Sequence, residues 1–332
     1  MSKEWLARSI VIVLAVGAIA IPAVASWGRR HGIEIHARMA ETGGWTPESL
    51  TAVVGVPLRL RLTSDDVIHG FAIGQTDLPV VDVIPGEFSE VTYTFDRPGK
   101  YTFYCTRWCG INHWRMRGAI VVSGPGTKPD IARPPLYVSL GLEIDARNPA
   151  DVVPVQKPSS ARGAWLGATI PAAYLSRDYY LAHSPLELWK ALRDEPNLRN
   201  FSDQDIWDLA ALVWKSNATP QELKTGQQLY ATNCAACHGE SGAGDGVFAD
   251  QLDRPKSGEH AEMRAGEMTT RPAGFTAPQS MLSASPAQLQ GKIIRGGMGT
   301  GMPYWGPIFT EEQTWALVAH LWTFQFDLED RP

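Results

Sequence analysis

Four side chains that could bind a metal lie within twelve positions of the chain: Cys105, Cys109, His113 and Met116, spaced C-x3-C-x3-H-x2-M. Thiolate and thioether sulfur beside imidazole nitrogen is a donor set that copper sites use. Two cysteines four apart can bridge one pair of metal ions only if a tight loop turns both sulfurs inward. Such a loop needs another nitrogen donor, and His69, upstream beside an apolar strand-like run, is the candidate.

Two other uses of this cysteine pair stay open on spacing alone. The two thiols could form a disulfide with each other, or they could join a zinc site, because zinc sites use similarly spaced cysteines. The methionine at a fixed offset and the distant histidine before Gly70-Phe71 favour copper.

The second cysteine pair, in Cys234-Ala-Ala-Cys237-His238, has the signature of covalent c-type haem attachment. The chemistry explains the spacing, because two thiols add across the two vinyl groups of one haem while the adjacent histidine reaches the iron. A thioredoxin-like cysteine pair would not need His238 and would need a βαβ context that is missing. These two pairs are the chain's 4 cysteines, so none is left for a structural disulfide.

An electron-transfer haem of this kind also needs a sixth iron ligand. Methionine is the expected one, because His/Met ligation raises the haem potential. The methionines that follow His238 are Met263, Met268, Met281, Met298 and Met302.

In the segments around the loop 105–116, called the copper loop below, apolar and polar residues alternate as in β-strands. Leucines and arginines alternate over 58–62, and Val91-Thr-Tyr-Thr-Phe95 alternates before the turn signal Arg97-Pro98-Gly99. Short strands separated by Gly/Pro turns predict an all-β sandwich or barrel. Loops at one end of such a fold can hold metal ligands rigidly. The geometry of the metal site then changes little between oxidation states, which favours electron transfer.

Residues 33–122 resemble the CuA cupredoxin domain of subunit II of the haem–copper oxidases. The resemblance is in 63–71, Ile84-Pro-Gly86, 98–101 and the loop 105–116. It implies a Greek-key cupredoxin fold that holds a dinuclear copper centre.

The resemblance also implies a ligand set for the two coppers. Many oxidases have glutamate at the position of Arg107, so the role of that carboxylate at a neighbouring magnesium site does not carry over to this chain. The implied set has Cys105 and Cys109 as bridges, His69 and His113 on one copper each, and Met116 and the backbone carbonyl of Arg107 as weaker outer ligands.

The region from about Thr219 to the C-terminus resembles class I cytochromes c, with a helix over 226–236 that runs into the haem motif. The resemblance implies Met302, in a Gly-Met-Pro loop before the last helix, as the axial ligand, with Met298 next. It also implies that the carbonyl of Pro272 accepts the N–H of the iron-binding imidazole, which would fix the tautomer of that ring.

A partial repeat precedes this region, because residues 184–214 resemble 285–322. Both copies are predicted to end in a helix that Ser202 or Thr310 opens as N-cap, with tryptophans seven residues apart on one face. The first copy has no CxxCH before it and lacks seven residues around the methionines. We therefore expect a haem-less cytochrome-type half that acts as a helical spacer.

Residues 9–28 carry no charge and are long enough to cross a bilayer as a helix. Trp5 and Trp27 flank them as interfacial aromatics would. The basic start and Ala23-Val-Ala25 would also suit a cleaved signal peptide. We favour an uncleaved single-span membrane anchor, because subunit II of the resembled family is membrane-anchored. Either interpretation places both redox domains on the outer, periplasmic side.

Composition and pattern together predict a multidomain protein: a transmembrane helix, an all-β cupredoxin domain, then an all-α cytochrome c-like domain. The 332 residues carry a net charge of −5, which gives no basic surplus for nucleic acid. Residues 136–144 could add a short strand, and 149–162 resemble a linker. The predicted domains are 1–31 (anchor or signal peptide), 32–125 (CuA cupredoxin), 126–162 (linker), 163–218 (haem-less half-repeat) and 219–332 (cytochrome c).

A dinuclear copper and a His/Met haem leave no open coordination position, so this chain would carry electrons without doing chemistry itself. The resemblance implies the electron-entry subunit of a haem–copper oxygen reductase, passing electrons from cytochrome c or another donor through haem and CuA to subunit I. The alternatives are the CuA/haem c subunit of a nitric oxide reductase and a free-standing electron carrier. Nitrous oxide reductase also has a CuA domain, but it needs a His-rich propeller that this sequence lacks.

Overall fold

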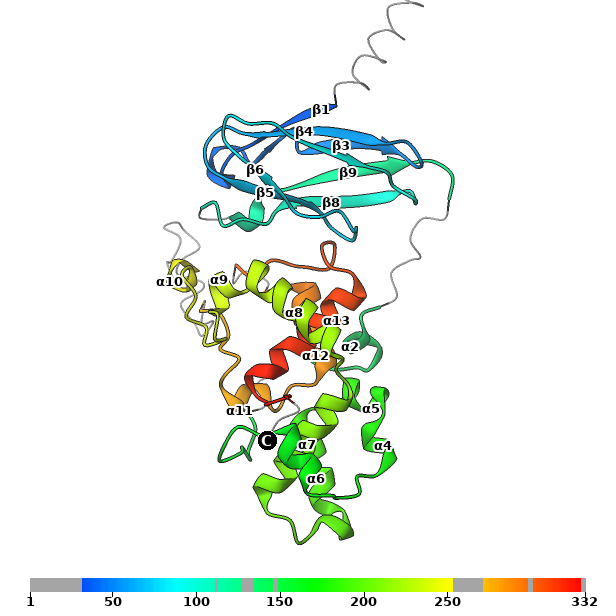
Figure 1. The fold of residues 1–332 in the computed structure, drawn as a ribbon, viewed down its shortest axis with the longest axis vertical. Helices are drawn as coiled ribbons and strands as arrows, with labels where there is room; N and C mark the ends of the chain where they lie inside the picture. Colours follow the sequence, from blue (N-terminus) through cyan, green and yellow to red (C-terminus); the bar gives the residue numbers. More distant parts are fainter. Residues whose placement is uncertain are drawn as a thin grey trace, which may run out of the picture. The chain divides into compact units, whose positions relative to one another are not determined.

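The computed structural model describes residues 32–110, 113–126, 134–145, 149–252, 271–297 and 301–329. The chain divides into two compact units, Met1–Ile131 and Ala132–Pro332. The first is built from strands and the second from helices (Figure 1). The predicted membrane anchor lies outside the described residues. Among the helices that are described, none combines the length and the hydropathy that a bilayer crossing requires.

The first unit is a sandwich of two β-sheets, which confirms the prediction of an all-β domain. One sheet has the strand order β2-β1-β4-β7 and the other β3-β9-β8-β5-β6. The strands are β1 (Ile33–Ala37), β2 (Trp45–Thr46), β3 (Ser49–Val53), β4 (Leu58–Ser64), β5 (His69–Ile73), β6 (Val81–Val83), β7 (Ser89–Tyr93), β8 (Gly99–Cys105) and β9 (Arg117–Ser123), with the 3-10 turns η1 (Ala40–Thr42) and η2 (His113–Arg115).

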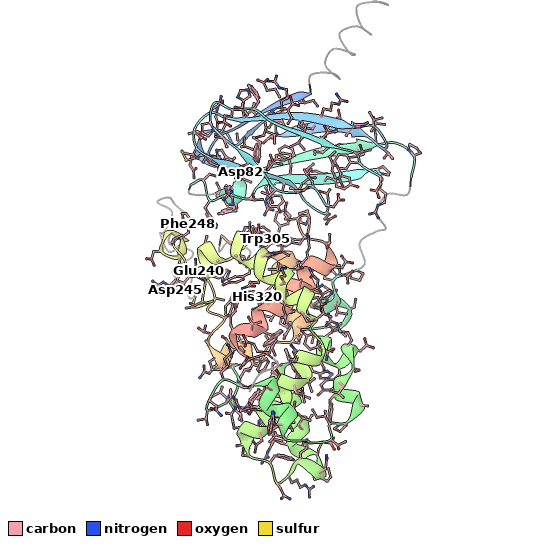
Figure 2. All side chains as sticks on the ribbon, viewed as in Figure 1. Asp82, Glu240, Asp245, Phe248, Trp305 and His320 are labelled. Atoms are coloured by element: carbon pink, nitrogen blue, oxygen red, sulfur yellow. The ribbon has the colours of Figure 1, made fainter. Side chains whose placement is uncertain are left out.

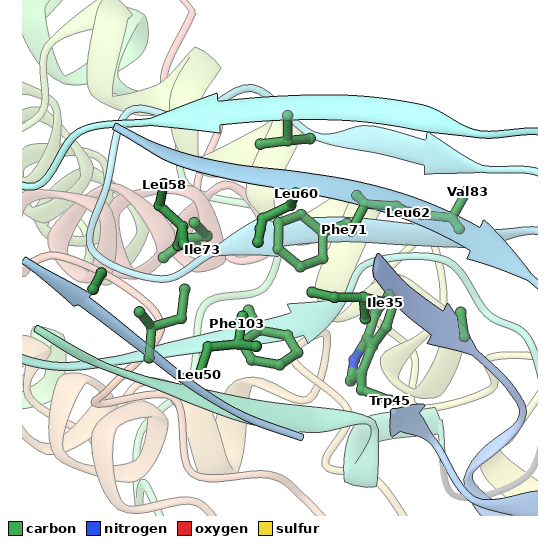
Figure 3. Packing of buried hydrophobic residues seen from close by; sticks show 14 of the residues in the cluster. Ile35, Trp45, Leu50, Leu58, Leu60, Leu62, Phe71, Ile73, Val83 and Phe103 are labelled. Carbon is green, nitrogen blue, oxygen red and sulfur yellow. The ribbon is translucent and has the colours of Figure 1, made fainter. Parts of the chain in front are cut away.

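The hydrophobic core of this unit lies between the two sheets (Figure 3). The leucines of β4 are buried and Arg59 between them is exposed, as the alternation predicted. Trp45, Phe71 and Phe103 pack together, with ring centroids 5.6 to 5.9 Å apart. Aromatic groups of this size dominate the burial energy of small cores, so this cluster gives the neighbouring loops a firm base.

The second unit is a set of short helices. The elements are α2 (Leu136–Ser139), α3 (Ser160–Trp165), α4 (Ala172–Leu175), α5 (Arg177–Ala182), α6 (Pro185–Asp194), η3 (Pro196–Leu198), α7 (Asp203–Ser216), α8 (Pro220–Asn233), α9 (Ala235–His238), α10 (Ala249–Leu252), α11 (Pro278–Met281), α12 (Pro286–Arg295), α13 (Glu311–Leu321) and η5 (Trp322–Phe324).

Capping side chains determine where the longer helices begin. Ser202 opens α7 and Thr310 opens α13, each accepting a backbone N–H three residues on, which confirms both predicted N-caps. In both caps the third helical residue bonds back to the N-cap amide, so the capping box is complete. Helices α6, α8 and α12 begin with the same device.

Two expectations for the segment before α6 need correction. Residues 136–139 form the helix α2 and not a strand. Residues 149–162 are ordered against the helical unit: Arg162 forms two hydrogen bonds of 2.8 Å with the buried carboxylate of Asp208, and the N–H of Ser159 donates to the same group. A buried carboxylate requires such partners, and they come from a segment that composition alone marks as a linker.

Candidate metal centre and haem attachment site

Two antiparallel neighbours, β5 and β8, bring His69 and Cys105 together. Phe71 pairs with Cys105 at the end of β8, and the N–H of Thr106 continues the ladder to the carbonyl of Gly70. Residues diagonal to each other on such a pair are within side-chain reach. A Cβ at position 70 would lie 2.1 Å from the Thr106 hydroxyl, so the close approach requires glycine.

The two cysteine sulfurs and two histidine rings form one cluster at this end of the sandwich. The Sγ atoms of Cys105 and Cys109 are 4.0 Å apart, and neither is in a disulfide. The Nδ1 atom of His69 lies 3.8 Å from the sulfur of Cys105, and that of His113 lies 3.6 Å from the sulfur of Cys109. Donor atoms of His69, Cys105 and Cys109 all fall within 4.8 Å of one another, close enough for shared metal binding.

Met116 and Arg107 complete the cluster with weaker donors. The thioether sulfur of Met116 lies 3.3 Å from Cys109 Sγ, and the carbonyl oxygen of Arg107 lies 3.2 Å from Cys105 Sγ. The Arg107 side chain instead forms two hydrogen bonds with Asp82 of β6 (labelled in Figure 2), at 2.9 and 2.8 Å. The backbone carbonyl of Arg107 therefore faces the cluster, and its guanidinium anchors the loop to a neighbouring strand.

Trp45 links the copper loop to the core. Its indole N–H donates to the carbonyl of Met116 at 3.1 Å, and the N–H of Cys105 donates to the same oxygen. The two ends of the loop are thus joined beside the aromatic cluster. A loop closed in this way keeps its donor atoms in place, which suits a metal site that must change geometry little.

The charges in the cluster favour the thiolate form of one cysteine. Hydrogen bonds from Cys109, then from the rings of His113 and His69, outweigh burial and hold the pKa of Cys105 well below its usual value. The Cys105 thiolate in turn raises the pKa of Cys109. Burial opposes the protonation of His69, but its contacts with Cys105 and Asp66 outweigh burial and raise its pKa. Because metals bind deprotonated sulfur, binding at Cys109 must displace a proton.

Asp66 orients His69 through a contact that no sequence motif indicates. Its Oδ1 lies 2.7 Å from Nε2 of His69, and the carboxylate also accepts the N–H groups of Met39 and Val67. Burial of the carboxyl is outweighed by these bonds, of which the one to His69 is the largest, and the pKa of Asp66 falls. With Nε2 held in this way, Nδ1 faces the sulfurs, which is the usual carboxylate–histidine–metal arrangement.

Replacing Asp66 with asparagine should therefore weaken copper binding while leaving the fold intact. The loss should be about 10- to 100-fold in affinity, the usual effect of removing a partner that orients a metal-binding histidine. Asp65→Asn is the matched control, because the Asp65 carboxylate bonds to His36 and Arg38 and not to the cluster. Copper titration of both variants checks this, and equal affinities would contradict the role given to Asp66.

The CxxCH motif lies where α8 runs into α9. Cys234 is the last residue before α9, and His238 ends that short helix. The chain then folds back over the motif, since the N–H of Gly244 donates to the carbonyl of His238 and that of Gly246 to the carbonyl of Cys237. Both thiols and the imidazole are therefore held in a fixed turn, as attachment to one haem requires.

Burial changes the pKa values of the two cysteines and the histidine in this motif, in directions that suit thioether formation by the thiols and iron binding by the imidazole. Burial raises the pKa of Cys234 to about 12 and that of Cys237 to about 11, so both remain thiols. Burial also lowers the pKa of His238, which keeps its ring neutral. Nδ1 of His238 donates a hydrogen bond of 2.9 Å to the carbonyl of Ala273, and Nε2 is the atom left for iron.

The acceptor for His238 corrects the assignment of Pro272. The carbonyl that accepts is that of Ala273, one residue later, while the Pro272 carbonyl faces Gly244 instead. The ring of His238 also stacks on Phe275, with centroids 4.7 Å apart. A proline in this loop indicates the segment from sequence, but only backbone geometry decides which carbonyl points at the ring.

Met302 lies in a short loop before α13. Its side chain is half-buried and its carbonyl accepts the N–H of Gly297 at 3.2 Å. The N–H of Trp305 (labelled in Figure 2) donates to the carbonyl of Ile293 and ties the loop to α12. Met281 is buried in the core. The other three methionines of the sequence analysis, Met263, Met268 and Met298, lie outside the described residues.

Comparison with known proteins assigns two parts of the chain. Residues 46–124 match the family model described as cytochrome c oxidase subunit II, periplasmic domain, and residues 223–325 match the model described as cytochrome c. Two curated proteins of Thermus thermophilus, both named cytochrome c oxidase subunit 2, are each 44% identical over 79 residues. These residues are 24% of this chain and 58% and 46% of the relatives, so the chain spans about half the length of the curated relatives it matches.

Two solved structures are similar over parts of the chain. A haem–copper terminal oxidase dimer is 23% identical, with 37% of this chain and 100% of that chain covered and a TM-score of 0.24. The periplasmic domain of subunit II of the Bradyrhizobium japonicum cytochrome oxidase is 29% identical, with 23% and 54% covered and a TM-score of 0.21.

The donor groups described above fit the cofactors that these families hold. A cytochrome c domain with a CxxCH motif implies a covalent haem c, and a subunit II domain with clustered thiols and imidazoles implies a CuA copper centre. Residues 46–124 of this chain are therefore similar to the periplasmic domain of cytochrome c oxidase subunit II, and residues 223–325 are similar to cytochrome c.

Proposed function

We propose that this chain is the electron-entry subunit of a membrane haem–copper oxygen reductase. In this role it takes electrons from cytochrome c or another donor and relays them through haem c and CuA to the catalytic subunit I. The observation that carries the proposal is the sulfur–imidazole cluster around Cys105 and Cys109, in the same chain as Cys234-Ala-Ala-Cys237-His238.

The copper centre would be held by the six groups of the cluster. When bound, a dinuclear copper centre supplies reversible one-electron chemistry. The chain's own residues keep the donor atoms still: the β5–β8 ladder sets His69 against Cys105, and the Trp45 indole fixes the carbonyl of Met116. The ligands would be Cys105, Cys109, His69, His113, Met116 and the carbonyl of Arg107.

The haem would be attached through Cys234 and Cys237. Neutral His238 would offer Nε2 to the iron, because its Nδ1–H already donates to the carbonyl of Ala273. Met302 would supply the sixth ligand, since it lies between α12 and α13 in a loop that is tied to α12. The aromatic ring of Phe275 stacked on His238 limits the rotation of the imidazole.

Neither site would have an open position for a substrate, so the chemistry would take place on a partner. That partner would be the oxygen-reducing subunit I, in a membrane where the N-terminal residues 1–31 serve as anchor. Both redox units would then face the periplasm, in line with the periplasmic family that residues 46–124 match.

Purification of the tagged full-length chain from membranes of the native host tests this function. We expect it to bring down a haem-rich multi-span subunit, and the complex should consume oxygen when given reduced cytochrome c. A complex that reduces nitric oxide and not oxygen would identify a nitric oxide reductase instead. Recovery of the chain alone would contradict a role as an oxidase subunit and indicate a free electron carrier.

A further inference from the structure

Helix α3 crosses α7 in the same manner as α8 crosses α13. A Cβ on Gly163 of α3 would stand 2.3 Å from the carbonyl oxygen of Asp208 in α7. A Cβ on Gly226 of α8 would stand 2.0 Å from the carbonyl oxygen of Ala316 in α13. Each crossing is therefore so close that the helix backbones touch through a buried glycine.

The two crossings correspond along the whole length of the repeat. Asp208 directly follows Trp207, and Ala316 directly follows Trp315. Because these two tryptophans are equivalent positions of the sequence repeat, Asp208 and Ala316 are equivalent as well. Helix α6, which begins at the Ser184 cap, corresponds in the same order to α12 and its cap. The first copy of the repeat therefore begins with helix α3 and includes α6 and α7. It corresponds to the whole helical arrangement of the second copy, and not only to the C-terminal half that the sequence indicated.

The sequences of the two opening segments agree when the two crossing glycines are aligned. Residues 163–169 read Gly-Ala-Trp-Leu-Gly-Ala-Thr and residues 226–232 read Gly-Gln-Gln-Leu-Tyr-Ala-Thr. In this register Pro171-Ala-Ala-Tyr174-Leu175 stands opposite Cys234-Ala-Ala-Cys237-His238. The structure supports the register, because α4 (Ala172–Leu175) and α9 (Ala235–His238) are short helices at matching positions.

The first copy lacks the residues that would attach and ligate the haem in the second copy. Proline, tyrosine and leucine stand where the two cysteines and the histidine would be. Only residues 176–183 join α4 to the cap of α6, whereas residues 239–284, including Ala273, join α9 to the cap of α12. The loop between α6 and α7 is also shorter by the seven residues around Met302.

Aromatic side chains pack the interior of the first copy. Tyr180 of α5 is buried, and its ring meets that of Trp214 edge-on at 5.3 Å. Trp189 of α6 stacks on Trp207 of α7 at 5.7 Å. Helix α5 belongs to the short connection that replaces the long one of the second copy, so part of this packing comes from the very segment that was shortened.

The first copy contacts the second copy through the side chain of Trp214 and through backbone hydrogen bonds. Trp214 meets Trp322 edge-on at 5.6 Å and lies 5.8 Å from Phe326, both directly after α13. The backbone beyond α13 also pairs with the start of the first copy, since Asp327 donates to the Pro158 carbonyl and accepts from the N–H of Ser160.

We propose that residues 157–216 are a second cytochrome c fold that has lost its haem and now serves as a permanently bound partner of the haem-carrying copy. Its contact residue is Trp214, which holds the segment 322–328 at the end of α13. The segment it holds is close to the haem site, because the neighbouring Gln325 side chain donates to the carbonyl of Phe275, which stacks on His238. The inference uses the covalent haem but not the oxidase assignment, so either can fail without the other.

Trp214→Ala in the full-length, haem-loaded protein tests the contact. Hydrogen exchange followed by mass spectrometry should show exchange in residues 322–328 accelerated by about ten-fold or more, as expected when a buried tryptophan is lost. Trp189→Ala is the matched control, since it removes the same side chain from the interior of the first copy. It should accelerate exchange in α6 and α7 and change 322–328 by less than about two-fold.

A second pair of variants, Lys157→Met and Lys190→Met, perturbs the protein less and tests the same contact if Trp214→Ala does not fold. The Lys157 ammonium donates to the carbonyl of Thr323 across the interface at 2.7 Å, whereas the Lys190 ammonium pairs with Asp151 on the side of α6. Lys157→Met should accelerate exchange in 322–328 by about three-fold, because one hydrogen bond is lost, and Lys190→Met should not. Unchanged exchange in 322–328 for both interface variants would overturn the proposal.

Substitutions at the glycines of the two helix crossings test whether residues 157–216 are a second cytochrome c fold. Gly163→Ala should remove exchange protection from α3 and α7, as Gly226→Ala should from α8 and α13, because each new methyl group meets a helix carbonyl. Ala164→Ser, on the exposed side of α3, is the control and should leave protection unchanged. If Gly163→Ala is tolerated, the two crossings are not equivalent and the assignment as a second cytochrome fold is wrong.

Discussion

Cys109→Ser should abolish the visible spectrum of the copper centre and leave the haem bands intact. The Cys109 sulfur lies within 4.0 Å of Cys105 Sγ, His113 Nδ1 and Met116 Sδ, so its loss removes the central donor of the cluster. A serine hydroxyl is a poor ligand for copper that thiolates bind. The haem motif is unaffected because it belongs to the other compact unit.

Absorption spectroscopy and metal analysis check this result. The variant should lose the purple mixed-valence bands and retain less than about half of its copper, while its haem content stays unchanged. Arg115→Lys is the control, since residue 115 is exposed in the same loop and offers no soft donor. A variant that kept the purple bands would contradict the ligand set. Zinc in place of copper in the unmodified protein would contradict the copper centre altogether.

Met302→Ala should lower the haem potential, on the order of 0.2 V, and remove the long-wavelength band of methionine-ligated ferric haem. Thioether sulfur stabilises the reduced iron, so water or another nitrogen ligand in its place favours the oxidised form. The backbone bonds from Gly297 to Met302 and from Trp305 to α12 keep the loop in place, and neither uses the side chain that is removed.

Met298→Ala is the comparison that decides between the two methionines of this loop. It removes the same side chain four residues earlier and should leave both the potential and the band unchanged. If the potential falls in Met298→Ala and not in Met302→Ala, Met298 is the axial ligand. Redox titration of both variants, with spectra of the oxidised forms, separates these outcomes.

Local patterns predicted the elements that carry the sites. The Leu/Arg alternation of 58–62 became β4 because one face of that strand packs into the sandwich core. Ser202 and Thr310 open helices because their hydroxyls satisfy backbone N–H groups only three residues away. Cys234-Ala-Ala-Cys237-His238 is a contiguous motif, and its last four residues form the short helix α9. The two caps depend on neighbours only three residues away, and the strand and the haem motif each show a pattern of residue types along a short stretch of chain, which is why sequence could show them.

Contacts between distant segments could not be predicted in this way. Composition marked 149–162 as a linker, yet Arg162 is bound to the buried Asp208. The carbonyl that accepts from His238 is that of Ala273 and not of Pro272, because the turn of the 271–275 loop decides which carbonyl faces the ring. Asp66 was visible three residues before His69, but nothing local shows that its carboxylate bonds to that ring.

The types of donor in each site could be recognised from single residues: two thiols, one imidazole and a thioether in the loop 105–116, with His69 as a second imidazole from upstream, and a CxxCH motif in another part of the chain. Which atoms meet depends on the packing of distant segments: His69 reaches Cys105 through the pairing of β5 with β8, and Gly163 meets Asp208 where two helices cross. The physical reason is that side-chain chemistry is a property of single residues. The distance between two residues far apart in the chain depends instead on how the whole fold packs.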